Sequence, residues 1–302
     1  MITVLGSINM DLIANVARLP KPGETISGDT FTTAAGGKGA NQALAARRAG
    51  SDVVMAGAVG DDEFSAPALN YLRDAGTGLS AVKTAPGATG VALIFVGGDG
   101  ENMISIVPGA NGTVTPEDAE RCVSTMSRGD YLMLQFEITP AAIERALTAA
   151  KKAGIKTVFN IAPISAGSIP LAKMADIVIA NETEFETLTG KSDLSGEARE
   201  KEMMKLYEEC GQTIIVTLGG DGVVAVRDGE ISRAAGLKID PVDTVGAGDT
   251  FCGYLVASLD QGLKFPAALK RAAVAGSLAC LKRGAQASIP WAKDVKEQLD
   301  RQ

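Results

Sequence analysis

Two glycine-rich segments contain the residues of this chain whose types and spacing suit chemistry. In DTVGAGDTF, at residues 243–251, Gly246 and Gly248 precede a predicted helix and Asp249 falls in its first turn. The free N–H groups and positive dipole at a helix start attract anions, such as the charge that develops on a transferring phosphoryl group. A carboxylate beside them can accept the proton of an attacking hydroxyl. An aspartate there can equally serve only the helix dipole.

The other segment, GGKGANQ at residues 36–42, opens a second predicted helix. Its glycines let the backbone approach a ligand closely, and Lys38 and Asn41 add donors one helical turn apart. The segment is not a Walker A loop, because Gly39 stands where Ser or Thr must follow Gly-Lys. The 243–251 segment is not a dinucleotide fingerprint, because Phe251 occupies the third glycine position.

Short apolar, β-branched runs alternate with longer stretches of helical period along the chain. This alternation predicts an α/β fold, in which a doubly wound, mostly parallel sheet is flanked by helices. The expected strands are Ile2–Gly6, Val53–Gly57, Tyr131–Leu134, Thr157–Asn160, Ile177–Ala180 and Thr213–Leu218. The expected helices include Lys38–Ala49, Glu63–Ala75, Pro140–Ala153, Ser195–Cys210, Gly248–Leu259 and Pro266–Leu281.

Polar residues follow the carboxyl ends of these predicted strands, which is the edge where open parallel sheets bind ligands. They are Asn9, Asp11, Gln135, Glu137, Asn160, Asn181, Glu184 and Thr217, with Gly219 and Gly220 just beyond. A single Asn is most often a turn former, but a whole edge of such residues favours a site. An edge rich in Asn, Asp and Glu suits a polyhydroxylated ligand, whose hydroxyls need donors and acceptors.

Two stretches break the strand–helix alternation. Residues 14–34 are rich in Gly, Pro and Thr, and residues 89–107 contain two apolar runs joined by GGDGEN, which is a hairpin signal. Together they predict a small β-sheet outside the main domain, and a sheet near ligand-bearing loops is a candidate lid. An edge meander without function is the alternative.

The composition excludes several classes of protein. The chain has no histidine, so Ser-His-Asp triads, Cys-His pairs and His-based zinc sites are ruled out. A net charge of −7 without a basic stripe argues against nucleic acid as a partner. No apolar run approaches membrane-spanning length, and the N-terminus lacks the basic region of a secretory signal. Four scattered cysteines without a CxxC pair fit reduced thiols in the cytoplasm.

At these segments the chain resembles the ribokinase-like carbohydrate kinase family, also called the PfkB family, from about Thr3 to Ile289. The matching strings are GSINMD at 6–11, PGET at 22–25, GGKGANQA at 36–43, VGDDEF at 59–64, PGAN at 108–111, NETE at 181–184, DTVGAGDTF at 243–251 and KRGAQAS at 282–288. The resemblance implies one kinase domain over residues 1–302, with lid strands within about 12–35 and 89–108. It also implies transfer of the γ-phosphate of ATP to the 5-hydroxyl of a sugar, expected to be D-ribose.

The resemblance assigns roles to particular residues. Asp249 is expected to be the base, with the amides of Gly246, Ala247 and Gly248 as the anion hole. The residues expected to bind the sugar are Asn9, Asp11, Gly37, Lys38, Asn41, Glu137 and Asp249 itself. The residues expected to bind the nucleotide are Asn181, Thr217, Gly219, Gly222 and Gly248, and Glu184 is expected to organise Mg²⁺ through water.

A monovalent cation, K⁺, is a further expectation. Asp243 offers a carboxylate near the predicted anion hole, and a helix that stops at Gly284 leaves carbonyl oxygens unpaired for a hard cation. The resemblance implies a ligand set of Asp243, Val245, Ala279, Lys282, Gly284 and Ser288, mostly through carbonyls. A plain helix end with a capping aspartate is the alternative. The family also implies a homodimer joined through the lids.

Three other functions are compatible with parts of this pattern. A kinase for another pentose, deoxyribose or a nucleoside fits the same motifs. A nucleoside needs a stacking surface, yet aromatic residues make up only 4% of the chain, with Phe31 and Phe95 as the main candidates in the lid. A non-catalytic sugar-binding protein has no need of Asp249 beside the glycines. A nicotinamide dehydrogenase is disfavoured, because no GxGxxG follows the first strand.

Overall fold

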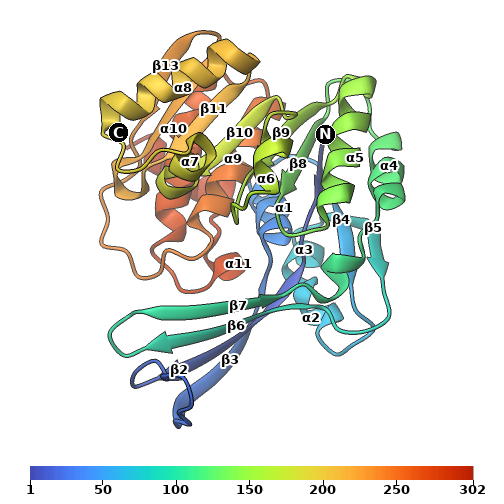
Figure 1. Ribbon diagram of the computed structural model, residues 1–302, viewed down its shortest axis with the longest axis vertical. Helices are drawn as coiled ribbons and strands as arrows, with labels where there is room; N and C mark the ends of the chain where they lie inside the picture. Colours follow the sequence, from blue (N-terminus) through green and yellow to red (C-terminus); the bar gives the residue numbers. More distant parts are fainter. Residues whose placement is uncertain (302) are drawn as a thin grey trace.

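The computed structural model describes residues 1–301 and contains two β-sheets (Figure 1). The strands of the larger sheet are β1 (Ile2–Leu5), β4 (Val53–Val59), β5 (Gly78–Thr84), β8 (Tyr131–Gln135), β9 (Lys156–Asn160), β10 (Ile177–Asn181), β11 (Thr213–Thr217), β12 (Val223–Arg227) and β13 (Glu230–Ala234). Their order is β13-β12-β11-β10-β9-β8-β1-β4-β5. Neighbours are parallel from β5 to β11, and only β12 and β13 pair antiparallel. The expected mostly parallel sheet is confirmed.

Helices cover both faces of this sheet, so that its central strands are buried on two sides. One core contains residues of α1 (Lys38–Arg48), α2 (Ser65–Ala68), α3 (Asn70–Asp74), α9 (Ala247–Asp260), α10 (Phe265–Ala279) and α12 (Ala292–Leu299). The other contains residues of α4 (Pro116–Ser124), α5 (Pro140–Ala153), α6 (Ser168–Ala172), α7 (Glu182–Thr189) and α8 (Gly196–Cys210). Successive residues of β8 alternate between the cores, which explains why its sequence is apolar throughout.

The smaller sheet is built from the two irregular stretches and extends away from the main body (Figure 1). Its strands are β2 (Asn9–Val16), β3 (Gly28–Gly36), β6 (Gly90–Gly97) and β7 (Asn102–Val107), in the order β3-β2-β6-β7. The expected hairpin is present as the antiparallel pair β6 and β7. Asn9 and Asp11 follow the first strand, as expected, and both lie in β2, which begins at Asn9, slightly earlier than the expected lid strand. We refer to this sheet as the lid.

The predicted helix over residues 63–75 is also corrected. The segment forms α2 and α3, two short helices that meet at Leu69. Pro67 has no N–H to donate, and the chain tightens there, with Leu69 N bonded to Ala66 O at 3.2 Å. One further short helix, α11 (Ala285–Ser288), and two 3-10 helices, η1 (Gly109–Thr113) and η2 (Gly219–Asp221), complete the fold. No helix within residues 1–301 is both long and apolar enough to cross a membrane.

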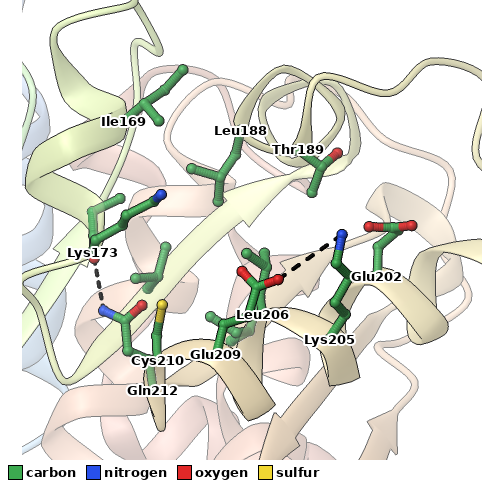
Figure 2. A pocket seen from close by; sticks show the side chains of 13 residues that line it. Ile169, Lys173, Leu188, Thr189, Glu202, Lys205, Leu206, Glu209, Cys210 and Gln212 are labelled. Carbon is green, nitrogen blue, oxygen red and sulfur yellow. Dashed lines mark hydrogen bonds and ion pairs between the residues drawn. The ribbon is translucent and has the colours of Figure 1, made fainter.

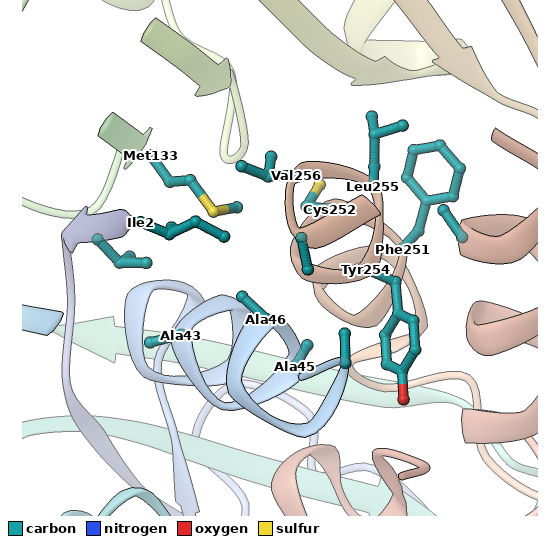
Figure 3. Packing of buried hydrophobic residues seen from close by; sticks show 14 of the residues in the cluster. Ile2, Ala43, Ala45, Ala46, Met133, Phe251, Cys252, Tyr254, Leu255 and Val256 are labelled. Carbon is teal, nitrogen blue, oxygen red and sulfur yellow. The ribbon is translucent and has the colours of Figure 1, made fainter. Parts of the chain in front are cut away.

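Helices α1 and α9 approach each other closely, and this contact positions the site (Figure 3). The surface of α1 that faces α9 carries Ala45 and Ala46, whose small side chains leave room for α9. A Cβ on Gly253 would lie 2.5 Å from Ala45 Cβ, so only glycine fits at the crossing. The close approach brings the beginning of α1 against the beginning of α9.

Candidate active site

Asp249 is held by two amide side chains from the first turns of α1. It lies in the first turn of α9 and is only 8% exposed. Asn41 Nδ2 donates to Asp249 Oδ2 at 2.9 Å, and Gln42 Nε2 donates to Asp249 Oδ1 at 2.9 Å. Each carboxylate oxygen has two lone pairs and therefore keeps one for a substrate proton. The two glycine-rich segments, about 200 residues apart in sequence, meet at this carboxylate.

The backbone before Asp249 has the form of an anion hole. Gly246 caps α9 in the left-handed conformation, with φ 77°, and its carbonyl accepts from Thr250 N. A Cβ at Gly248 would meet no atom within 4 Å, so this side of the helix start faces open space. Ala247 N already donates a long hydrogen bond of 3.3 Å to Thr244 O, so this amide is less available to an anion. Gly248 is therefore the most open of the three predicted hole residues.

Two more carboxyl groups, from Asp11 and Glu137, lie near the base. Burial, together with the charges of Glu137 and Asp249, raises the pKa of Asp11 to about 7. Glu137 Oε2 accepts from Ser7 Oγ at 2.5 Å and from Lys38 N at 3.1 Å, so Glu137 is fixed to the start of α1. The three carboxyl groups, from β2, the segment after β8, and α9, thus lie within range for their charges to act on Asp11.

Glycines and amides shape the rest of this region. A Cβ on Gly36 would overlap both carboxylate oxygens of Asp11, and one on Gly37, at φ 88°, would lie 2.8 Å from Asn9 N. Asn9 Oδ1 accepts from Asn111 Nδ2 at 2.7 Å. This contact orients the Asn9 amide group and leaves its N–H₂ group available to donate to a ligand. These contacts explain why the motif requires two adjacent glycines.

Lys38 is the cation that the surrounding carboxylates share. Burial lowers its pKa, but the charges of Asp249, Glu137 and Glu184 outweigh burial and raise it overall. Burial also raises the pKa of Glu184, against the opposing effect of Lys38. Lys38 is expected to bind the sugar, and a cation within range of these three carboxylates is also suited to a negatively charged ligand group.

Asn181 and Glu184 form the capping box of α7. Glu184 N donates to Asn181 Oδ1 at 2.8 Å, and Asn181 N donates to Glu184 Oε2 at 2.8 Å. Thr217 is the register neighbour of Asn181 across β10 and β11. Beyond Thr217, Cβ atoms on Gly219 or Gly220 would meet nothing within 4 Å, so the chain there borders open space. Gly222, at φ 93°, has no room for a side chain against Ala234.

The predicted cation residues form a hydrogen-bonded junction beside the anion hole. Asp243 Oδ1 accepts from Val245 N at 3.0 Å, and Asp243 Oδ2 accepts from Gly284 N at 2.9 Å. Cys280 O accepts from the amides of Val242 and Asp243. The capping role of Asp243 is therefore present, and its carboxylate oxygens keep further lone pairs for a cation. Of the other residues expected to bind the cation, Ala279 and Ser288 are buried, whereas Lys282 is exposed.

Sequence reasoning missed several residues of the site. They are Gln42, Ser7 and Asn111, whose contacts are described above and below. A signal was present for two of them, because Gln42 stands next to Asn41 in the same motif and Asn111 belongs to the PGAN string. Their partners lie far away in sequence, so only the fold reveals them. Within residues 1–301 no three acidic, Cys or His side chains gather as a ready metal site.

A separate cavity of about 200 Å³ lies between α6, α7 and α8 (Figure 2). Its wall is largely apolar, with Ile169, Leu188, Leu206 and Ile214, and Lys205 and Glu209 at its edge form a loose ion pair of 3.9 Å. None of the predicted site residues lines it. The cavity therefore has no part in the chemistry at Asp249.

Comparison with known proteins agrees with this geometry. Residues 1–292 match the pfkB family carbohydrate kinase. Ribokinase of Haemophilus influenzae is 35% identical over 300 residues, with 99% of this chain and 98% of that protein covered. Deoxyribokinase of Salmonella typhi is 34% identical, with 99% and 98% covered. The structure of Arabidopsis thaliana ribokinase complexed with ribose and ATP superposes with a TM-score of 0.90 at 32% identity, covering 99% and 98% of the two chains. The chain belongs to the pfkB family of carbohydrate kinases.

Proposed function

We propose that this protein transfers the γ-phosphate of ATP to the 5-hydroxyl of D-ribose, with Asp249 as the general base. The observation that carries the proposal is at Asn41, whose Nδ2 binds Asp249 while its Oδ1 is buried without a partner among residues 1–301. A buried acceptor left unpaired costs about 1–3 kcal/mol, which a hydroxyl donor from a ligand would recover. A sugar hydroxyl held by Asn41 would lie beside the base.

Asp11 and Glu137 provide the further acceptors that a polyhydroxylated ligand needs. The charges of Glu137 and Asp249 both act on the Asp11 carboxyl group, so the three lie in one region. The Arabidopsis ribokinase that binds ribose and ATP has the same fold over nearly the whole chain, which supports D-ribose as the sugar. The similarity to deoxyribokinase makes 2-deoxy-D-ribose the second candidate.

In the proposed reaction, the sugar 5-oxygen attacks the γ-phosphorus as the bond to the β–γ bridging oxygen breaks. Asp249 accepts the hydroxyl proton, and the amide of the exposed Gly248 donates to the phosphoryl oxygens. Lys38, which already lies among Asp249, Glu137 and Glu184, offsets the negative charge of the transferring group. The magnesium ion that accompanies ATP neutralises phosphate charge, and Glu184 is the carboxylate suited to hold it through water.

The nucleotide is proposed to lie along Thr217, Gly219 and Gly222, with Asn181 at its phosphates. The open space next to Gly219 and Gly220 supports this assignment. K⁺ is proposed to bind at Asp243 and the surrounding carbonyls, where it would stiffen the loop that carries Gly246 and Asp249. The lid is proposed to close over the sugar and to join two chains in a homodimer, and the free cysteines support a cytoplasmic location.

The test is a coupled ADP-release assay with Mg²⁺ and KCl, in which D-ribose, 2-deoxy-D-ribose, other pentoses, hexoses and adenosine are compared. We expect the highest kcat/KM for D-ribose and phosphate on its 5-oxygen. A value at least tenfold higher for deoxyribose or adenosine would reassign the substrate, and ADP release that no sugar stimulates would refute the kinase. Replacing KCl by choline chloride at equal ionic strength should lower kcat, and an equal rate in both salts would rule out the K⁺ site.

A further inference from the structure

Gln42 is a buried residue in a chain of side-chain amides that ends at Asp249. Its side chain is only 1% exposed, and its Nε2 donates both to Asp249 Oδ1 at 2.9 Å and to Asn160 Oδ1 at 3.1 Å. Gln135 Nε2 donates to Gln42 Oε1 at 2.7 Å. All polar atoms of the Gln42 side chain are therefore used within the protein, and none is left for the sugar.

A backbone carbonyl fixes the direction of this chain. Asn160 Nδ2 donates to Ile179 O at 3.2 Å, and a carbonyl oxygen can only accept. Asn160 must therefore turn its Oδ1 towards Gln42, so that Gln42 presents its Nε2 on this side. Gln135 holds the other end, because it donates to Gln42 Oε1. An amide that could otherwise sit in either of two orientations is locked with its N–H groups towards Asp249.

Close packing holds the side chains of Gln135 and Gln42 in place. A Cβ on Gly6 would overlap Gln135 Oε1, so glycine at the end of β1 is what admits the Gln135 side chain. A Cβ on Gly253 would lie 2.6 Å from Gln42 O, so glycine one turn after Asp249 sets how near Gln42 comes to the base. Gln135 Oε1 is buried without a partner among residues 1–301, which destabilises the folded protein. A residue that only filled space would not need this unpaired oxygen, so the Gln135 amide serves to hold Gln42.

We propose that Gln42 is a positioning residue for the catalytic base, locked by Gln135 so that it fixes the plane of the Asp249 carboxylate. This inference rests on the proposed function in taking Asp249 as the base. Asn41 also binds Asp249 but keeps Oδ1 free for the sugar, so the two neighbours have separable effects. Loss of Asn41 alters sugar binding, whereas loss of Gln42 alters the chemical step alone.

The test compares Gln42→Met with Gln212→Met. Gln212 is also a buried glutamine, 7% exposed, and it donates to two backbone carbonyls, Ala172 O and Ala175 O, away from the site. We expect Gln42→Met to lower kcat about 10- to 100-fold, since a small displacement of a reacting group has effects of that size, while the KM for the sugar stays within about twofold. Gln212→Met should lose comparable thermal stability and keep its kcat.

Two further readouts separate positioning from simple loss of packing. An N–H donated to a carboxylate favours its charged form, so the acidic limb of the kcat–pH profile should move to higher pH in Gln42→Met but not in Gln212→Met. Gln135→Met, which keeps Gln42 but removes the lock, should show a smaller shift in the same direction.

Crystal structures of the variants give a readout that needs no substrate and is therefore independent of the proposed function. The Asp249 carboxylate should rotate in Gln42→Met and keep its orientation in Gln212→Met. An unchanged carboxylate, an unchanged pH profile, or a rise in sugar KM at constant kcat would each overturn the inference. Absence of sugar kinase activity in the unmodified protein would refute the proposed function instead.

Discussion

Arg199 on α8 and Glu182 at the start of α7 form an ion pair in which Arg199 Nη2 lies 2.5 Å from Glu182 Oε1. Arg199 is 8% exposed and also donates to Leu194 O at 3.2 Å. Glu182 directly follows Asn181, so the pair ties the capping box of α7 to α8. The contact therefore stabilises the helix start that is proposed to meet the phosphates of the nucleotide.

We predict that Arg199→Met raises the KM for MgATP about 3- to 10-fold, because a charged hydrogen bond that orders the capping box is worth about 1.5–3 kcal/mol and only part of it appears in binding. The KM for the sugar should change less than about twofold. Arg145→Met is the matched control, since Arg145 pairs with Glu120 at 2.7 Å between α5 and α4. Equal effects of the two variants on MgATP would contradict the role of Arg199.

A second prediction concerns the base itself. Asp249→Asn should lower kcat by roughly 10²–10⁴, the range for loss of a general base, with little change in the KM for the sugar. Because Asn41 and Gln42 both donate to Asp249, one donor will face the new N–H₂ group of the asparagine, and a fall in melting temperature of a few degrees is expected. Initial rates and differential scanning fluorimetry measure both effects. Retention of most of the activity would make Asp249 only a helix-start residue.

The sequence predicts the main sheet and the base well, for local reasons. Strands such as β8 and β11 are short apolar runs because both of their faces are buried, and the turn residues at their ends mark the edge where ligands bind. Asp249 could be selected because glycines and a helix start surround it in the same segment. Each of these signals lies within about ten residues of chain, where periodicity and turn chemistry operate.

The parts that the sequence does not predict depend on contacts between distant segments. The role of Gln42 follows from the approach of α1 to α9, and the carboxyl cluster follows from β2 running out of the main body directly after β1. Asp11 therefore sits in a lid strand, although its place after a buried strand resembles a loop. The pKa of Asp11 likewise depends on Glu137 and Asp249, which no local pattern places beside it.

The third prediction separates the two faces of the lid. The pairing registers place Asp11, Ala92 and Ile106 side by side on one face of the lid. Ile94 and Ile104 lie on the same face, two residues further out along β6 and β7. The opposite face carries Phe95 beside Met103 and, across β2, Phe31, which is 66% exposed. The face with Asp11 is the one directed at the proposed sugar site, so the opposite apolar face is available to a second chain.

Met103→Glu and Ile104→Glu are adjacent substitutions on β7 that test this assignment. Met103 is 49% exposed and Ile104 is 50% exposed, so neither change disturbs a core. We expect Met103→Glu to turn the proposed dimer into a monomer in light scattering at micromolar concentration. Ile104→Glu should leave the dimer intact and raise the KM for the sugar several-fold. An unmodified protein that is already monomeric would refute the dimer, and the reverse pattern would exchange the two faces.

The last prediction uses the titration of Asp11. Its pKa is raised from 3.8 to about 7, first by burial and then by the charges of Glu137 and Asp249. Between these two values the unfolded chain carries the ionised group while the folded protein still holds the proton. Folding thus takes up a proton, and the stability that Asp11 contributes is present below pH 4 and is lost as the pH rises through about 7. The full effect corresponds to about 4 kcal/mol of unfolding free energy.

Asp11→Asn removes this penalty and the sugar acceptor together. In urea unfolding without substrates, we expect the variant to be more stable than the unmodified protein at pH 8, with the difference disappearing towards pH 4. The sugar KM of the unmodified protein should rise as the pH falls below about 7, because the protonated carboxyl is a weaker acceptor, whereas the KM of Asp11→Asn should be higher and independent of pH there. Asp74→Asn, at an exposed position on α3, is the control and should match the unmodified protein in both measurements. A stability difference that stays constant from pH 4 to pH 8 would show that Asp11 is not the group that titrates.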